Sequence, residues 1–216
     1  MNSRRRLPHH YPENRWLFVT WTLHNSLPAF RFPPPAKTTS GEAFAWVDAY
    51  LDSRRSGPTF LAQEGIAELV IDSLYRGAKL GHYQLGPFAI MPNHVHALFL
   101  PSISPSQFLK SLKGSTAREA NKLLSRTGQP FWQRESYDHW VRNESEWNRI
   151  AKYIEKNPIR ADIVPAIEDY PWSSAHPRFS VHAPGGVHAP GGVHTSVNAA
   201  RTSACATATA DTRIPA

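Results

Sequence analysis

The chain has 216 residues, 41% of them hydrophobic, a formal net charge of +7 at pH 7 and one cysteine. A single cysteine excludes a disulfide framework and a cysteine-based metal site. No apolar run approaches the ~20 residues that cross a bilayer, so we expect a cytoplasmic protein without membrane contact. The basic balance favours a polyanionic partner, most often nucleic acid.

The first predicted element is a strand over residues 16–23, which are rich in aromatic and β-branched side chains. It opens a predicted folded domain, residues 15–174, that follows a basic N-terminal arm, residues 1–14. An irregular insertion, residues 28–57, comes next and has room for a short helix over 42–51. We expect this insertion to leave the functional motifs untouched.

The remaining elements alternate between helices and strands. Apolar spacing and turn residues predict a helix over 60–80, strands over 83–91 and 94–100, a helix over 105–124, a strand over 131–142 and a helix over 144–156. Asn143 and Glu146 resemble a capping box at the start of the last helix, and Asn157-Pro158 should end it. This order predicts an α+β fold, a ferredoxin-like antiparallel sheet with helices packed on one face. Residues 175–216 repeat Val-His-Ala-Pro-Gly-Gly and predict a disordered C-terminal tail.

His94-Val95-His96 lies on the predicted strand over 94–100. Because alternate residues of a strand share a face, His94 and His96 project side by side while Val95 points into the opposite layer. Two neutral imidazoles so placed can bind one divalent ion. The alternative is a pair of half-exposed strand histidines without a ligand. A further oxygen donor would favour Mg²⁺ or Mn²⁺ over zinc.

Tyr153 and Asn157 lie four residues apart on the last predicted helix and therefore on one face. A tyrosine hydroxyl there could reach a site on the sheet, and the asparagine carbonyl could be a third metal ligand. The alternative is an amphipathic tyrosine that packs its ring, followed by a helix-ending asparagine.

Two segments carry a resemblance to a known family. Met91-Pro-Asn-His-Val-His-Ala97 resembles the His-hydrophobic-His motif of the HUH endonuclease superfamily. Tyr153-Ile-Glu-Lys-Asn-Pro-Ile-Arg-Ala161, followed by Asp169-Tyr-Pro-Trp-Ser-Ser174, resembles the tyrosine helix and its sequel in the REP-associated tyrosine transposases, relatives of the single-tyrosine insertion-sequence transposases. The likeness runs from about residue 15 to residue 174.

The resemblance implies a nucleoid-associated enzyme that nicks and rejoins single-stranded or hairpin DNA made of palindromic repeats. It implies Tyr153 as the nucleophile, His94 and His96 as ligands of Mg²⁺ or Mn²⁺, and Asn157 as the third ligand. Exposed cations would follow the DNA backbone. The candidates are Lys110, Lys113, Arg118, Lys122, Arg134 and Arg142.

Other activities fit part of the same pattern. The fold could serve as a hairpin-DNA binder or repressor without catalysis, or a water-using hydrolase could employ the histidines and Asn157 without a covalent intermediate. Tyr137-Asp138-His139 places a second phenol beside an imidazole, and His24 could approach the site from the first strand. The oligomeric state, monomer or homodimer, is open.

Overall fold

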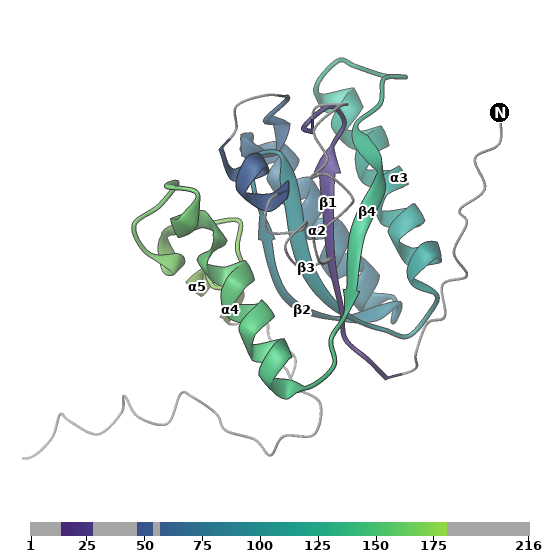
Figure 1. Ribbon diagram of the computed structural model, residues 1–216. Helices are drawn as coiled ribbons and strands as arrows, with labels where there is room; N and C mark the ends of the chain where they lie inside the picture. Colours follow the sequence, from purple (N-terminus) through teal and green to yellow (C-terminus); the bar gives the residue numbers. More distant parts are fainter. Residues whose placement is uncertain (1–13, 28–46, 54–56, 181–216) are drawn as a thin grey trace, which may run out of the picture.

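The computed structural model describes residues 14–27, 47–53 and 57–180 (Figure 1). The predicted order of strands and helices is present, and residues 47–52 are also helical. The elements are β1 (Leu17–Leu23), η1 (Phe60–Ala62), α2 (Glu64–Lys79), β2 (Tyr83–Ile90), β3 (His94–Pro101), α3 (Pro105–Leu123), β4 (Trp132–Trp140), α4 (Glu144–Arg160), η2 (Ile167–Asp169) and α5 (Pro177–Ser180). Within these ranges, no helix is both long and apolar enough to span a membrane. The basic arm and the repeat tail lie outside the described residues.

The four strands form one antiparallel sheet in the order β2-β3-β1-β4. The two central strands pair so that Thr20 of β1 lies opposite His96 of β3, and Thr22 lies opposite His94. This order, with α2 and α3 as the two crossovers, is the ferredoxin-like arrangement. The predicted α+β fold class is therefore confirmed.

Helices α2 and α3 cover one face of the sheet and enclose the larger core. Val19 and Trp21 of β1 point to this side, where they join Val70 of α2 and Phe108 of α3, all at most 2% exposed. Burying side chains of this size stabilises a fold by about 1.5–3 kcal/mol each. The hydrophobic core therefore occupies this face of the sheet, so we expect a functional site on the opposite face.

Helix α4 lies across that opposite face (Figure 1). Ile150 and Ile154 pack there against Phe18 of β1, Ala89 of β2 and Leu98 of β3. The expectation of helices on one face therefore holds for α2 and α3, whereas α4 forms a third layer. The strand residues that alternate away from the main core thus face α4.

The prediction that α4 ends at Asn157 is wrong, because the helix continues to Arg160 with Pro158 inside it. A proline removes one backbone donor, here the N–H that would reach the carbonyl of Ile154. The next turn still closes, since the N–H of Ala161 bonds to the Asn157 carbonyl at 3.0 Å. The extra turn carries Arg160 to the side of the helix on which Tyr153 lies.

The predicted cap of α4 is present in a modified form. The Asn143 side chain accepts a hydrogen bond from the N–H of Glu146 at 2.9 Å. The Glu146 carboxylate bonds one residue further back than in a capping box, to the N–H of Arg142 at 2.7 Å, and contacts His139 Nε2 at 3.1 Å. These contacts fix the angle at which α4 leaves β4.

Burial alone would raise the pKa of Glu146, but the Arg142 N–H and His139 outweigh it, so the pKa lies below its ordinary value. Its stabilising effect is thus present above the ordinary glutamate pKa and is lost as the pH falls through the lowered one. We expect Glu146→Gln to cost about 1–3 kcal/mol of unfolding free energy at pH 7, a difference that shrinks below about pH 4. Urea unfolding at several pH values measures it. Exposed Glu144→Gln, in the same helical turn, is the matched control, and an equal loss there would contradict the assignment.

Candidate active site

The two histidines lie at the start of β3, on the sheet face that α4 covers. Both are fully buried, and their Nε2 atoms are 3.0 Å apart. Val95 between them points into the core shared with α2 and α3. His96 Nδ1 contacts the hydroxyl of Thr20, its partner across the sheet, at 2.7 Å. The strand alternation expected from the sequence is thus present.

Asn93 fixes the proton position of His94. Its amide nitrogen donates to the Leu51 carbonyl at 2.9 Å, and its amide oxygen lies 2.7 Å from His94 Nδ1. The Leu51 carbonyl only accepts, so the amide orientation is set, and the amide oxygen in turn requires a proton on Nδ1. His94 Nε2 therefore presents its lone pair to the site, as metal-binding histidines do.

The insertion supplies a carboxylate that the sequence analysis did not find. Asp48, in the helical residues 47–52, is 1% exposed, and its Oδ1 lies 3.0 Å from His96 Nε2 and 3.8 Å from His94 Nε2. The expectation that residues 28–57 leave the motifs untouched is therefore wrong. Asp52, one turn later, places Oδ1 3.9 Å from His94 Nε2. Two acids four residues apart, Asp48 and Asp52, were the available signal, because such a pair shares one helical face.

The charges of this cluster depend on one another. Burial alone would raise the pKa of Asp48, but attraction and hydrogen bonding to His96, with His94 and Tyr153, outweigh it and hold that pKa well below its ordinary value. Burial, reinforced by His96 and opposed by Asp48, lowers the pKa of His94 to about 3. At neutral pH the site therefore offers an ionised carboxylate beside a neutral imidazole.

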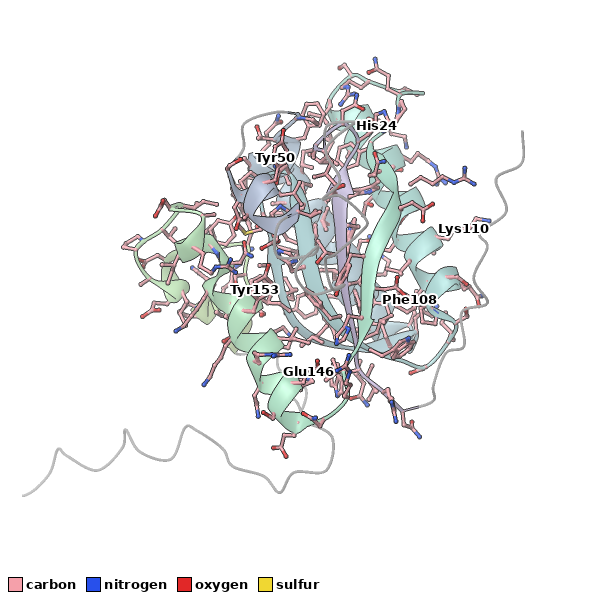
Figure 2. The ribbon with its side chains drawn as sticks, viewed as in Figure 1. His24, Tyr50, Phe108, Lys110, Glu146 and Tyr153 are labelled. Carbon is pink, nitrogen blue, oxygen red and sulfur yellow. The ribbon has the colours of Figure 1, made fainter. Side chains whose placement is uncertain are left out.

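Tyr153 reaches the same cluster from α4, as the sequence predicted it could. Its hydroxyl donates a hydrogen bond to Asp48 Oδ2, and its ring centroid lies 5.6 Å from that of His96. Burial and the Asp48 carboxylate raise the pKa of Tyr153 well above its ordinary value, with Arg160 opposing. Figure 2 shows Tyr153 on α4 beneath the helical segment that Tyr50 marks. The phenol is therefore protonated in this state and held in place by Asp48.

Asn157 lies one turn after Tyr153 and is fully buried. Its Nδ2 atom is 3.3 Å from His96 Nε2 and 3.4 Å from Asp48 Oδ2. Its Oδ1 atom is buried and has no hydrogen-bond partner among the described residues. Rotation of the amide by 180° would bring this oxygen to the cluster, so the side chain has the reach that the sequence analysis required.

These side chains fit a divalent cation. Ligand atoms of Asp48, His94 and His96 all lie within 4.8 Å of one another, and all three residues are buried. A carboxylate, two imidazoles and an amide oxygen form a mixed nitrogen and oxygen donor set, which suits divalent metals. The orphaned Asn157 oxygen is a further donor that such an ion would satisfy.

Most of the cations predicted to bind DNA are remote from this cluster. Lys110, Arg118 and Lys122 are exposed on α3, across the sheet from Tyr153, as Figure 2 shows for Lys110. Lys113 is half-buried, and its Nζ donates to the Arg134 carbonyl and to Ser136 Oγ, both at 3.1 Å. The side chains of Arg134 and Arg142 are exposed.

Tyr137 and His139, from the second tyrosine motif, make packing and hydrogen-bonding contacts on the site face of the sheet. Tyr137 lies opposite Thr20 on the site face and packs against Phe18, with ring centroids 6.2 Å apart. His139 on the same face contacts Glu146, the residue that holds α4. The His24 backbone N–H bonds to the Phe131 carbonyl at the end of β1.

Comparisons with known proteins agree with this geometry. Residues 59–157, from just before η1 to Asn157, match the family described as "Transposase IS200 like". This segment, just under half of the chain, is similar to the IS200-like transposases. The resemblance predicted from the sequence is thereby confirmed, and the matched residues include both histidines and Tyr153.

Individual relatives point the same way. A REP-associated tyrosine transposase of Escherichia coli (strain K12) is 23% identical over 96 residues, 44% of this chain and 55% of the relative. A Haemophilus influenzae protein named for the same family is 28% identical over 109 residues, 61% of its length. The chain thus spans about three fifths or less of these relatives. A solved REP-associated tyrosine transposase bound to a REP hairpin shares the fold, with a TM-score of 0.53 at 18% identity over 81% of this chain and 82% of that one.

The ligand geometry can be tested without DNA. Asn93→Ala removes the hydrogen bond that orients His94, so we expect Mn²⁺ affinity to fall about 10–100-fold. Asp48→Asn removes the charged donor and should lower that affinity at least as far. Isothermal titration calorimetry with Mn²⁺ measures both.

Asp72→Asn, the same change at an exposed position of α2, is the matched control. Thermal unfolding in a chelator shows whether the variants are folded. Mn²⁺ binding by folded Asp48→Asn at the affinity of the control would remove Asp48 from the ligand set.

Proposed function

We propose that this protein is a metal-dependent single-stranded DNA transesterase that cleaves and rejoins hairpin-forming DNA through a tyrosine adduct. The observation that carries the proposal is the meeting of Tyr153 with the histidine pair at one buried carboxylate. Asp48 Oδ2 accepts from the Tyr153 hydroxyl, and Asp48 Oδ1 contacts His96. A tyrosine that only packed its ring would need none of these partners.

The tyrosine chemistry follows from the proposed attack. The Tyr153 oxygen forms a bond to a backbone phosphorus while the bond from phosphorus to the 3′-oxygen of the preceding nucleotide breaks. The products are a 5′-phosphotyrosine and a free 3′-hydroxyl, and the phenolic proton leaves Tyr153 in the process. Because the phosphodiester count is unchanged, another 3′-hydroxyl can reverse the step and join strands without ATP.

The metal site would be made by His94 and His96, with Asp48 and Asn157 as oxygen donors. A bound Mg²⁺ or Mn²⁺ supplies positive charge that lowers the repulsion between a phenolate and a phosphodiester. Asp48 then has two tasks, since its two oxygens face different groups: one faces the histidines and the other orients the Tyr153 hydroxyl.

The DNA partner is part of the same proposal. The solved relative that shares the fold was bound to a REP hairpin, and this chain carries a net charge of +7. Cations of α3, of β4 and of the turn after β4 are proposed to contact parts of the DNA away from the reacting phosphate. They are Lys110, Lys113, Arg118, Lys122, Arg134 and Arg142.

The covalent intermediate gives the direct test. We expect purified protein with Mn²⁺ to form a slow-migrating protein–DNA band on a denaturing gel, using hairpin oligonucleotides from repeats beside its own gene. A fluorophore at the 3′ end should travel with the protein, and one at the 5′ end should not, because the adduct is to the 5′-phosphate. Tyr153→Phe should abolish the band.

Tyr137→Phe is the matched control, because Tyr137 is a second half-buried phenol on the same sheet face. It should retain the band. Cleavage that survives Tyr153→Phe would indicate a water-using nuclease. Binding without cleavage by any variant, with either metal, would indicate a hairpin-binding protein.

A further inference from the structure

The surface of α4 beside Tyr153 carries four cations that the proposed chemistry does not use. Arg149, Lys152, Lys156 and Arg160 are all exposed. They follow one another at steps of three, four and four residues, which keeps them on one side of a helix. They form a single stripe, named here the α4 stripe, that runs along about the last two thirds of the helix.

The α4 stripe borders the nucleophile. Tyr153 follows Lys152 directly and lies one turn from both Arg149 and Lys156. The guanidinium carbon of Arg160 lies 4.9 Å from the centroid of the Tyr153 ring. The buried stripe of α4, which includes Ile150 and Ile154, lies on the other side of Tyr153. The tyrosine therefore stands at the boundary between the closed site and the cationic surface.

The acids of α4 do not interrupt the stripe. Glu146 lies at the helix start and is 9% exposed. Its carboxylate accepts a hydrogen bond from the Arg142 N–H and contacts His139 and Arg149. Glu155 is half-buried and lies outside the series of three- and four-residue steps that the cations follow. The α3 cations differ in position, because they lie across the sheet from Tyr153; one cation of each set is paired with an acid, Lys122 with Glu119 at 3.0 Å and Arg149 with Glu146 at 3.2 Å.

We propose that the α4 stripe binds the phosphates of single-stranded DNA on one side of the phosphodiester that Tyr153 attacks. This inference rests on the proposed function and names the part of the DNA that enters the site. The eleven steps from Arg149 to Arg160 span about 16 Å of helix, roughly five nucleotides at the 3.4 Å spacing of a stacked strand. A strand that follows these cations is delivered to Tyr153 with its backbone facing the hydroxyl.

The test measures binding separately from cleavage, in the Tyr153→Phe protein. Arg149, Lys152 and Lys156 are changed together to Gln, which has similar helix propensity. Arg160 is kept because it contacts the tyrosine ring. The matched control changes Arg76, Lys79 and Arg178 to Gln, which removes the same charge from the α2 side of the sheet, where no DNA contact is proposed. Circular dichroism verifies that both variants keep their helices.

The two probes are a hairpin with a ten-nucleotide single-stranded extension on either side and the same hairpin with blunt ends. Each single-strand phosphate contact contributes ~0.7 to the slope of log affinity against log salt. The stripe variant should therefore lose about 2 from this slope, and roughly 100-fold in affinity at 0.1 M salt, for the extended hairpin. The blunt hairpin should lose much less.

Two results would overturn the proposal. One is an equal loss for both probes, which would place the duplex stem on the stripe. The other is an equal loss for the control variant, which would show that the effect comes from net charge alone. Adduct formation with intact Tyr153 is scored independently. An adduct without an effect of the stripe variant would support the transesterase activity and contradict the proposed path of the single strand. An effect of the stripe variant without an adduct would support the path and contradict the activity.

Discussion

The candidate site depends on the alternation of side chains along the two central strands. β1 and β3 each direct one set of residues into the core with α2 and α3 and the other set toward α4. A shift of one residue in the pairing register of a strand would turn each set of side chains to the opposite face. Val95 would then face α4, and both histidines would lie in an apolar core without partners. The large core thus fixes the register, and the register sets the direction of His94 and His96.

A second constraint joins parts of the chain that are distant in sequence. Asn93 touches the histidine after it and the carbonyl of Leu51, and Asp48 touches both histidines and Tyr153. The Asn93 contacts bring the helical residues 47–52 against the loop between β2 and β3, and the Asp48 contacts bring them against the start of β3 and against α4. Each is buried, where leaving a polar group unpaired costs about 1–3 kcal/mol. The same hydrogen bonds that hold the insertion in place therefore also prepare the ligand atoms.

The fold and half of the site could be read from the sequence because their signals are local. Alternation in His94-Val95-His96 and the four-residue step from Tyr153 to Asn157 each determine a shared face without knowledge of the rest of the chain. The position of Asp48 could not be read in this way. It depends on how an insertion without a strong periodic pattern folds back across the sheet, and on a contact spanning 105 residues. The end of α4 was mispredicted for a related reason. The prediction relied on the tendency of helices to end before a proline, whereas the helix continues through Pro158 to Arg160.

Helix α4 carries three surfaces, and their order around the helix has a consequence for the proposed DNA specificity. The apolar side holds the helix on the sheet, Tyr153 and Asn157 form the next strip, and the cations form the strip beyond. A double-stranded segment lying on the cations would keep its phosphates on the outside of a stiff duplex, away from the buried Asp48. A single strand can bend over Tyr153 while its neighbouring phosphates stay on the stripe. The proposed preference for unpaired DNA would then come from the boundary between the half-buried Tyr153 and an exposed cationic surface, and would require no recognition of the bases.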